Sequence, residues 1–431
     1  MNLENATSPL EAGQLKNLRI FACVADTGSI ARAAELLFKA PSAITRSIIE
    51  FERCVGMALF ERKPRGMLLN AYGDAVLIRG RRIQDEVQLA AADFLRSAPA
   101  SYPASPTVIN NLLFDGRKLQ FLIRLTDSRN ISTAAAQMRM TQAGASMALS
   151  RIEAGLGHTL FRRMMQGMVA TDVADRLTLR AKRILAELRH IGSDISAIAG
   201  KIRGSVVIGT LPLGRTFVFP TAIARALADF PGLRVSTIES PYEQLISGLR
   251  NGDIDVVFGA LRPTDLYKGL TTEPLFTDRL GVIVRSGHPL AKIARLQMTD
   301  LMSEKWILPK SKTPGRPLVD SSFQNLGLQA PTASVETADL AILRQLLIAS
   351  DMLAVTSPHQ LMFEIRSGLL AELPVALGKT TREIGLILRE GAMASPAIAA
   401  VLDAVRRQVR EHHSECFGPE RTLPSSFALE N

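Results

Sequence analysis

Two stretches in the first half of the chain carry apolar residues at the spacing that buries one side of a helix. In each stretch, four apolar residues are separated by four, three and four positions. These residues are Ile83, Val87, Ala90 and Phe94 in the first stretch and Ile184, Leu188, Ile191 and Ile195 in the second. Apolar positions at this spacing form a stripe that needs a partner helix to cover it. The pattern therefore predicts two long helices, each with one buried side.

The two stretches belong to a longer internal repeat. Residues 18–73 align without a gap with residues 119–174, at an offset of 101 positions. The identical pairs include Leu18/Leu119, Asp26/Asp127, Ala33/Ala134, Ala34/Ala135, Glu52/Glu153, Leu59/Leu160, Phe60/Phe161, Arg62/Arg163 and Gly66/Gly167. Each copy therefore reads as a compact module followed by a long helix. Between the copies, residues 97–106 are rich in Pro, Ser and Ala, which predicts a semi-extended linker.

The first copy has the pattern of a helix-turn-helix. Residues 30–37 predict a first helix with an Ala-Ala pair, which lets a second helix cross it closely. Pro41 suits the start of that second helix, over residues 42–54, because the missing N–H has no intrahelical partner there. The residues that this helix presents to a major groove are Ser42, Thr45 and Arg46. Residues 57–70 then predict a two-stranded wing, whose basic residues for phosphate contacts are Arg62, Lys63 and Arg65.

The second copy repeats this plan. Residues 131–138 predict the first helix, and a threonine precedes the second helix as a good N-cap. A glutamine, a serine and an arginine lie along this candidate recognition helix, and two arginines open the wing. The residues expected to contact DNA in this copy are Thr141, Gln142, Ser146, Arg151, Arg162 and Arg163.

Both copies resemble the N-terminal domain of LysR-type transcriptional regulators. The shared marks are the Ala-Ala pair, a short turn, a Ser or Thr in the second helix, Phe-Glu or Ile-Glu, a Gly, and Leu-Phe-x-Arg. The resemblance implies two winged helix-turn-helix modules that bind double-stranded DNA. The copies depart from the family pattern at different places. Pro41 replaces the usual Gln, which Gln142 keeps, whereas Met147 replaces a common basic residue and Arg129-Asn130 replaces the usual Gly-Ser.

The second half of the chain alternates strand-like and helix-like segments. Strands are predicted over 205–209, 233–238, 254–259, 280–284, 306–308 and 352–356, and helices over 217–230, 242–250 and 340–349. This rhythm predicts a mostly parallel sheet with helices on both faces, so the fold class is α/β overall. Segments 249–255, 275–276 and 287–290 resemble the effector domain of the same family. That resemblance implies a two-lobed domain, similar to periplasmic binding proteins, that binds a sugar or an aromatic or organic acid.

The resemblance also implies a ligand cleft between the lobes. Ligands of such sheets bind beyond the carboxyl ends of strands, where three loops are candidates. The residues expected to contact an effector are Leu211, Pro212, Leu213, Arg215, Ser240, Tyr242, Pro309 and Lys310. Two of these loops open helices, where free backbone N–H groups suit a carboxylate or hydroxyl. The alternative for each loop is an ordinary capped helix start.

Charge divides the chain into two unequal halves. Residues 1–203 hold 28 Lys and Arg against 18 Asp and Glu, whereas residues 204–431 hold 23 of each, so the net charge of +10 lies in the first half. A basic half joined to a neutral half indicates a polyanion-binding part and a part with another role. The second copy, residues 101–203, holds 15 basic against 7 acidic residues, compared with 13 against 11 in residues 1–100.

Other signals restrict function and location. The three cysteines have no metal-ligand spacing or disulfide framework, and His288 has no partner ligand at a suitable spacing, so no metal site or cofactor is expected. No long apolar run or secretory signal appears, so we expect a cytoplasmic, nucleoid-associated protein without membrane contact. No Gly-x-Ser-x-Gly or phosphate loop appears, so we expect no enzyme. The alternatives are a DNA-architectural protein with a vestigial sensor and, less favoured, a solute-binding protein.

Domain boundaries and assembly follow from these patterns. We expect winged modules over 15–73 and 116–174, linker helices over 74–97 and 175–201, a Pro/Ser-rich linker over 98–114, an effector domain over 204–412 and a tail over 413–431. The second apolar stripe, extended to Ile198, is expected to pair with its copy in another chain and give a dimeric or tetrameric homo-oligomer. Packing of the stripe onto the chain's own modules is the alternative. The family resemblance further implies RNA polymerase as a partner.

Overall fold

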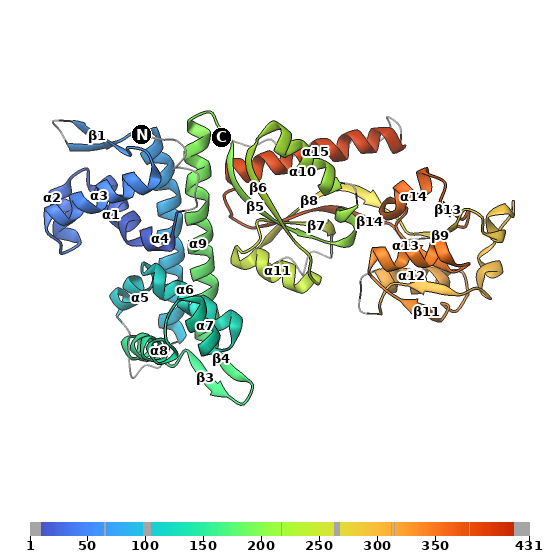
Figure 1. Ribbon diagram of the computed structural model, residues 1–431, viewed down its shortest axis with the longest axis horizontal. Coiled ribbons are helices and arrows are strands. Elements are labelled where there is room, and N and C mark those ends of the chain that lie inside the picture. Colours follow the sequence, from blue (N-terminus) through green and yellow to red (C-terminus); the bar gives the residue numbers. More distant parts are fainter. Residues whose placement is uncertain are drawn as a thin grey trace.

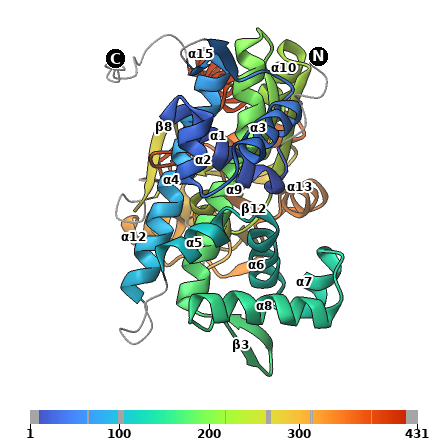
Figure 2. The same ribbon diagram turned by 90° about the vertical axis from the view of Figure 1, so that its left-hand side faces the viewer.

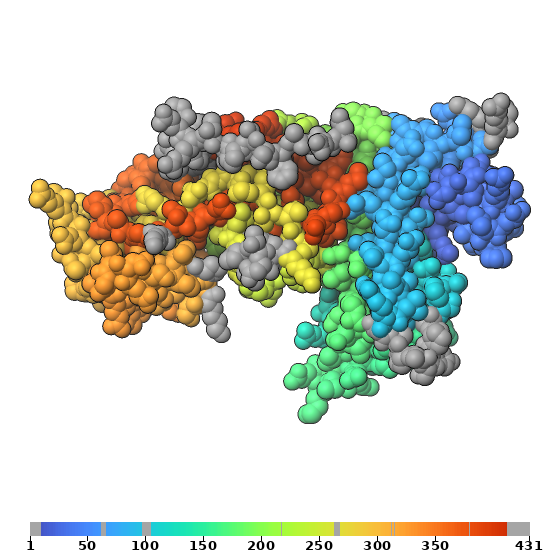
Figure 3. Space-filling model, turned by 180° about the vertical axis from the view of Figure 1, so that it is seen from behind, coloured from blue at the N-terminus to red at the C-terminus, as the bar shows by residue number. Residues whose placement is uncertain are grey.

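Three parts make up the molecule: two small modules, an antiparallel pair of long helices, and a two-lobed α/β domain (Figure 1). The computed structural model of the chain describes residues 10–63, 66–97, 105–216, 218–262, 268–311, 313, 315–378 and 380–417. Figure 1 shows the first module on the side of the helix pair that faces away from the two-lobed domain, and the second module at the lower end of the pair, where its wing (β3, β4) extends below that domain. From behind, the long helix α4 (cyan) lies between the blue first module and the two-lobed domain (Figure 3).

The first module is a helix-turn-helix with a two-stranded wing. Its elements, with the long helix that follows, are η2 Ala12–Gln14, α1 Leu15–Thr27, α2 Ile30–Leu36, α3 Pro41–Val55, β1 Phe60–Lys63, β2 Gly66–Leu69 and α4 Ala71–Ser97. The Ser29 side chain caps α2 by accepting the Arg32 N–H, and Pro41 occupies the first turn of α3, as predicted. Gly56 ends α3 in the left-handed region at φ 84°, where a glycine has no steric penalty.

The second module follows the same plan, with one additional helix at its start. Its elements are α5 Pro106–Leu113, α6 Gly116–Ser128, α7 Ile131–Gln137, α8 Gln142–Leu156, β3 Phe161–Met164, β4 Gly167–Ala170 and α9 Asp172–Ile198. The structure corrects the expected linker over 98–114, because residues 106–113 form α5. This helix is capped by Ser105 and buries Ile109, Leu112 and Leu113. Residues 98–104 of that expected linker lie outside the described residues.

Equivalent residues make equivalent contacts in the two modules. Glu52 accepts the backbone N–H of Leu59 at 2.8 Å, and Glu153 accepts that of Leu160 at 2.7 Å, so each carboxylate ties its recognition helix to its wing. The wing glycine Gly66 has φ 127°, and a Cβ there would lie 2.5 Å from the carbonyl oxygen of Gly28. Gly167 repeats this close approach in the second module. The repeat in the sequence is therefore a repeat in three dimensions.

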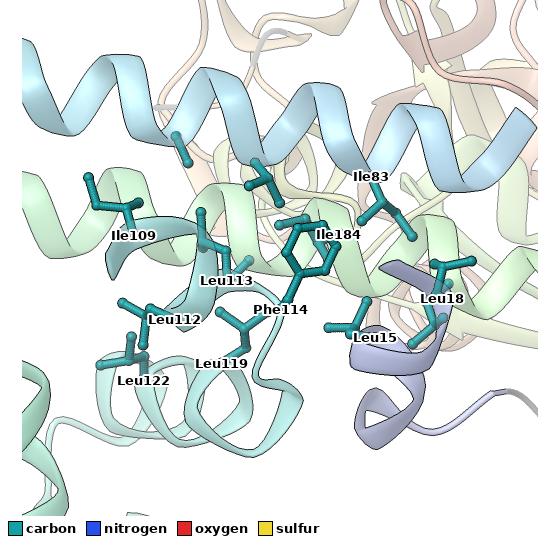
Figure 4. Close-up of a cluster of buried hydrophobic side chains, with 14 of the residues drawn as sticks. Leu15, Leu18, Ile83, Ile109, Leu112, Leu113, Phe114, Leu119, Leu122 and Ile184 are labelled. Carbon is teal, nitrogen blue, oxygen red and sulfur yellow. The ribbon is translucent and has the colours of Figure 1, made fainter. Parts of the chain in front are cut away.

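The two long helices cover each other's apolar stripes within one chain. Helices α4 and α9 make the most extensive contact between any two elements of the described chain. The residues of both stripes are 0–2 % exposed. Figure 4 shows side chains of the first module, the second module and the long helices meeting in one core, among them Leu15, Phe114, Ile83 and Ile184. The expected pairing of the α9 stripe with a second chain is therefore wrong, and Ile198 lies outside the stripe with 43 % of its surface exposed.

The first lobe of the α/β domain is a five-stranded mixed sheet with helices on both faces. Its elements are β5 Arg203–Thr210, η3 Pro212–Arg215, α10 Val218–Asp229, β6 Gly232–Ile238, α11 Tyr242–Asn251, β7 Val256–Ala260, β8 Leu270–Asp278, β14 Arg382–Arg389 and α15 Pro396–Phe417. The strand order is β6-β5-β7-β14-β8, in which β5 pairs in parallel with β6 and β7. Strand β14 pairs antiparallel with both of its neighbours.

The second lobe is another five-stranded mixed sheet. Its elements are β9 Gly281–Arg285, η5 Pro289–Lys292, η6 Met298–Leu301, β10 Trp306–Leu308, α12 Gly315–Asn325, β11 Ala333–Glu336, α13 Leu340–Ala349, β12 Leu353–Thr356, η7 Pro358–Leu361, α14 Met362–Arg366 and β13 Leu370–Glu372. The strand order is β11-β10-β12-β9-β13. The chain crosses between the lobes twice, from β8 to β9 and from β13 to β14. The expected mostly parallel sheet is thus two mixed sheets, one in each lobe.

Candidate DNA-binding face and lobe junction

The polar residues predicted to contact DNA from helix α3 differ in their exposure to solvent. Ser42 and Arg46 are exposed. Thr45 is half-buried, and its hydroxyl donates to the carbonyl oxygen of Pro41 at 3.0 Å, one turn earlier in the helix. Arg46 is therefore an exposed long side chain in the first half of this helix that can reach a base edge, and Ser42 lies next to the helix N-terminus.

Helix α8 presents Gln142 and Ser146, both exposed. Thr141 serves as the N-cap, because its hydroxyl accepts the Gly144 N–H at 3.1 Å. Arg151 is exposed but lies five positions after Ser146, about 140° round the helix. It lines a hollow of about 620 Å³ between α5, α6 and α8, together with Asp115 and other residues. Arg151 therefore belongs to a different side of α8 from the residues at its start.

The wings extend from opposite ends of the helix pair (Figure 1). Arg162 and Arg163 are exposed on β3. In the first wing, the backbone of Arg62 and Lys63 forms the end of β1, whereas Arg65 lies outside the described residues. The exposed pair on β3 suits contacts with phosphates that flank a groove.

The second module keeps its turn geometry despite losing the usual Gly-Ser. Arg129 adopts φ 50°, in the left-handed region that Gly28 occupies at φ 63° in the first module. Asn130 replaces Ser29 as the N-cap, accepting the N–H groups of Ser132 at 2.9 Å and Thr133 at 3.0 Å. A cap with two hydrogen bonds stabilises the turn that Arg129 strains. This departure from the family pattern thus leaves the fold of the module intact.

In the two-lobed domain, a buried carboxylate joins the lobes where the chain first crosses. Asp278, at the end of β8, accepts hydrogen bonds from Ser357 at 2.7 Å and Arg382 at 2.8 Å, and its other contact is with the His359 ring at 3.0 Å. Burial by itself raises the pKa of Asp278. The His359 hydrogen bond, the Arg382 charge and the Ser357 hydrogen bond outweigh burial and hold this pKa below 3.8. Short helix η3 of the first lobe also contacts η7 of the second.

The predicted effector residues occupy different environments. Leu213 is buried in the core of the first lobe, and Tyr242 is buried in a neighbouring core cluster with the Arg262 guanidinium 3.4 Å above its ring. Both side chains therefore pack in core clusters of the first lobe. Beyond the strand ends, Arg215 and Lys310 are exposed, and the half-buried residues are Leu211, Pro212, Ser240 and Pro309. Arg215 donates to the Thr210 carbonyl oxygen at 3.0 Å, which holds its head group against the end of β5.

A hollow of about 380 Å³ lies at the lobe junction. Its lining includes Asp278, Arg279, His359 and Met362, none of which the sequence indicated. Asp278 and Arg382 are 104 positions apart, so no local pattern signalled their contact. His288, in contrast, is structural as expected, because its ring bonds the Leu290 N–H at 3.2 Å and the Asp351 carbonyl at 3.1 Å.

Ion pairs dock the two-lobed domain onto the helix pair. Asp255, before β7, contacts Arg189 at 2.7 Å and His190 at 3.2 Å on α9, and accepts the Val207 N–H of β5 at 2.8 Å. Burial by itself raises the pKa of Asp255, but the His190 hydrogen bond and the Arg189 charge outweigh it and hold that pKa below 3.8. Arg79 of α4 also donates to the carbonyl oxygen of Met393 at 3.0 Å. The first lobe and the helix pair therefore share one polar interface.

Comparison with known proteins agrees with both halves of this architecture. Residues 15–74 and 117–175 each match the family of bacterial regulatory helix-turn-helix proteins of the LysR family, and residues 199–410 match the LysR substrate-binding domain. These matches define a DNA-binding regulator with a ligand-binding domain. The chain belongs to the LysR family of transcriptional regulators, and it carries that family's DNA-binding module twice.

Two curated relatives and one solved structure illustrate the similarity. The chain is 41% identical over 402 residues to the transcriptional regulator GalR of Pseudomonas putida, covering 93% of this chain and 99% of that relative. That alignment is too long to omit either module. It is 25% identical over 295 residues to PcaQ of Agrobacterium fabrum, covering 68% of this chain and 95% of that relative. Full-length OxyR of Pseudomonas aeruginosa has a similar fold, with a TM-score of 0.50 at 20% identity over 68% of this chain and 94% of that one.

Among the described residues, no helix is long and apolar enough to span a membrane. No three His, Cys, Asp or Glu side chains in the described part of the chain are grouped so that they could hold a metal ion.

Proposed function

We propose that this regulator binds promoter DNA through α3, α8 and the wings, and that a small organic acid or sugar at the lobe junction controls this binding. The observation that carries the proposal is the attachment of both modules to one helix pair, onto which the two-lobed domain is docked by ion pairs. The expected DNA contacts are Ser42, Arg46, Gln142, Ser146, Arg162 and Arg163. We further propose that it acts in the cytoplasm at the nucleoid, contacts RNA polymerase there, and catalyses no reaction.

An acidic effector is favoured over a neutral one by the charges near the strand ends. Arg215 and Lys310 are exposed beyond β5 and β10, on the two lobes. The charge of the buried Asp278 is already compensated by Arg382. A carboxylate between the lobes would therefore meet positive charge from both sides.

The lobe junction also has a physical route to the DNA-binding modules. Arg189 and His190 of α9 bond Asp255, whose other oxygen bonds the backbone of β5, the strand that leads into η3 and Arg215. A ligand that moves η3 would change the strain on this interface. It would thereby favour one of two arrangements of the modules, provided that it binds these arrangements with different affinity.

Thermal unfolding of the full-length chain in the presence of aromatic carboxylates, aliphatic dicarboxylates and sugars tests the proposal. One ligand class should raise the unfolding temperature and change the affinity for DNA measured by fluorescence anisotropy. Arg215→Ala and Lys310→Ala should each weaken that stabilisation. The matched control is Arg407→Ala, because Arg407 is an exposed cation of α15 that pairs with Asp229, away from the strand ends. Equal loss in the control, or no effect of any ligand, would contradict the proposed effector site.

A further inference from the structure

We propose that one chain is a complete two-headed DNA-binding unit that reads a non-palindromic site in one fixed orientation. One half-site, containing a guanine, faces α3, and a different half-site, containing an adenine, faces α8. The proposal rests on the proposed function, since it takes these two helices as the recognition helices. It goes further in naming the kind of duplex site that they accept.

The first argument is an internal two-fold relationship within the chain. Arg79 of α4 contacts Glu187 and Asp194 of α9, each at 2.6 Å. The residues at the equivalent positions, 101 positions away, make the same contacts with the two helices exchanged, so that the arginine lies on α9 and the carboxylates lie on α4. These contacts are Arg180–Glu86 at 2.8 Å and Arg180–Asp93 at 3.1 Å. Reciprocal contacts of this kind define an isologous interface, which two-fold symmetric dimers use between separate chains. Here both halves of the interface belong to one polypeptide.

The second argument is that this interface is closed. The apolar stripe of α9 is covered by that of α4. Arg79 of α4, in the same helix pair, is fully buried. The same core continues into both modules through α1 and α5 (Figure 4). A second chain therefore finds no uncovered stripe here, and the relative position of the two modules is set within one molecule.

The third argument is the spacing of the modules. Each of the two long helices has 27 residues, which corresponds to about 40 Å at the usual rise of an α-helix. The helices run antiparallel, and each module precedes the N-terminal end of its own helix. The modules are therefore attached near opposite ends of the pair, on one face (Figure 2). Half-sites one turn of B-DNA apart, about 34 Å, suit this separation.

The fourth argument is that the two heads share a backbone but differ in the side chains that they present. A dimer of identical modules would show identical residues to both half-sites. In this chain, Arg46 of α3 corresponds to Met147 of α8, and both are exposed. Pro41 corresponds to Gln142 at the first position of the recognition helix. The two heads therefore carry different base-reading groups at matching places.

These groups favour different bases. An arginine makes two hydrogen bonds with the O6 and N7 atoms of guanine, and a glutamine makes two with the N6 and N7 atoms of adenine. Each pair of bonds discriminates against the wrong base by about 5- to 150-fold. Met147 lacks a donor for guanine and suits contact with a thymine methyl group. The preferred site therefore carries guanine in the α3 half and an A·T pair in the α8 half.

In vitro selection from a pool of random duplexes at fixed salt, with the full-length chain, tests the proposal. The wild-type chain should select one asymmetric motif, and sedimentation should show one chain on the shortest duplex that keeps full affinity. Arg46→Met should lose the guanine preference in one half by about 5- to 150-fold. Met147→Arg should create a guanine preference in the other half. The exchange of both residues should move the guanine from one half to the other.

The two substitutions control for each other, because they exchange exposed residues at equivalent positions and should leave the unfolding temperature of the chain unchanged. A palindromic motif, or two chains on the shortest duplex, would overturn the proposal while the proposed function stands. An unchanged motif for both single variants would overturn the assignment of the half-sites. A wild-type chain without any sequence-specific binding would overturn the proposed function as well.

Discussion

Replacing Arg79 by methionine tests whether the buried ion pairs between α4 and α9 hold the DNA-binding unit together. The Arg79 side chain is fully buried, and its partners Glu187 and Asp194 are 4% and 8% exposed. Methionine fills a similar volume without charge, so the change leaves Asp194 without its charged partner in a largely buried site, while Glu187 keeps the hydrogen bond from Arg82. Removing one partner of such a buried network costs about 3–5 kcal/mol.

The chain provides its own control at the equivalent position. Arg180 makes the equivalent contacts on the other side of the internal two-fold axis. It is 17% exposed, and its partners Glu86 and Asp93 are 13% and 19% exposed. Water can reach these carboxylates when the guanidinium is removed. We therefore expect Arg180→Met to cost about 1–2 kcal/mol, less than Arg79→Met.

Hydrogen exchange of the amides of α4 and α9 measures this difference, because the chain has several cores and global unfolding is not a two-state process. Arg79→Met should lower protection in these helices by about two to three and a half powers of ten, and Arg180→Met by about one. Addition of Asp194→Leu to Arg79→Met should restore part of the protection, because it removes one stranded carboxylate. Equal effects of the two arginine substitutions would refute the argument from burial.

The same network predicts the effect of pH on the helix pair. Burial by itself raises the pKa of Glu187, but the hydrogen bond from Arg82 and the charge of Arg79 outweigh it and hold the pKa below 4.5. A lowered pKa in the folded state stabilises the protein above the unfolded-state value, and this stabilisation is lost as the pH falls through the folded-state value. In Arg79→Met the pKa of Glu187 should rise, so protection of α4 and α9 should be lost at a higher pH than in the wild-type chain.

Three further predictions concern other parts of the molecule. Leu188→Asp places a charge in the buried α9 stripe, so it should destabilise the helix pair by at least about 3 kcal/mol and abolish DNA binding, as anisotropy would show; retained binding would contradict the closed interface. Asp278→Asn should lower the unfolding temperature near neutral pH and make that temperature less dependent on pH below about 4. The reason is that a carboxyl group with a lowered pKa contributes stability above that range, and an unaltered pH profile would contradict this role of Asp278. Arg162→Ala with Arg163→Ala should reduce the slope of log affinity against log salt by about two without changing the selected motif, and an altered motif would show that they read bases.

Local signals in the sequence were sufficient to predict the modules. The offset of 101 positions, the cap at Thr141 and the proline at position 41 specify short helices whose stability depends on residues within one or two turns. The strand and helix alternation after residue 203 was likewise a local pattern, and most of its elements appear near the predicted positions. The helix α5 was missed because prolines and serines precede it, although its Ile109 and Leu112 are apolar.

The tertiary structure alone decided which surface covers the apolar stripes. A stripe such as Ile184–Ile195 has the same pattern whether its partner is another chain or another part of its own chain. That choice depends on the reciprocal contacts of Arg79 and Arg180, which join residues 87 to 115 positions apart. The two-lobed site is of the same kind, because Asp278 meets Ser357 and Arg382 only after the chain has crossed between lobes and returned. The sequence by itself determined the modules and their chemistry, because helix caps and apolar periodicity act over a few residues. The pairing of the modules and the lobe junction required the folded chain, because charge pairs between distant residues have no periodic signature.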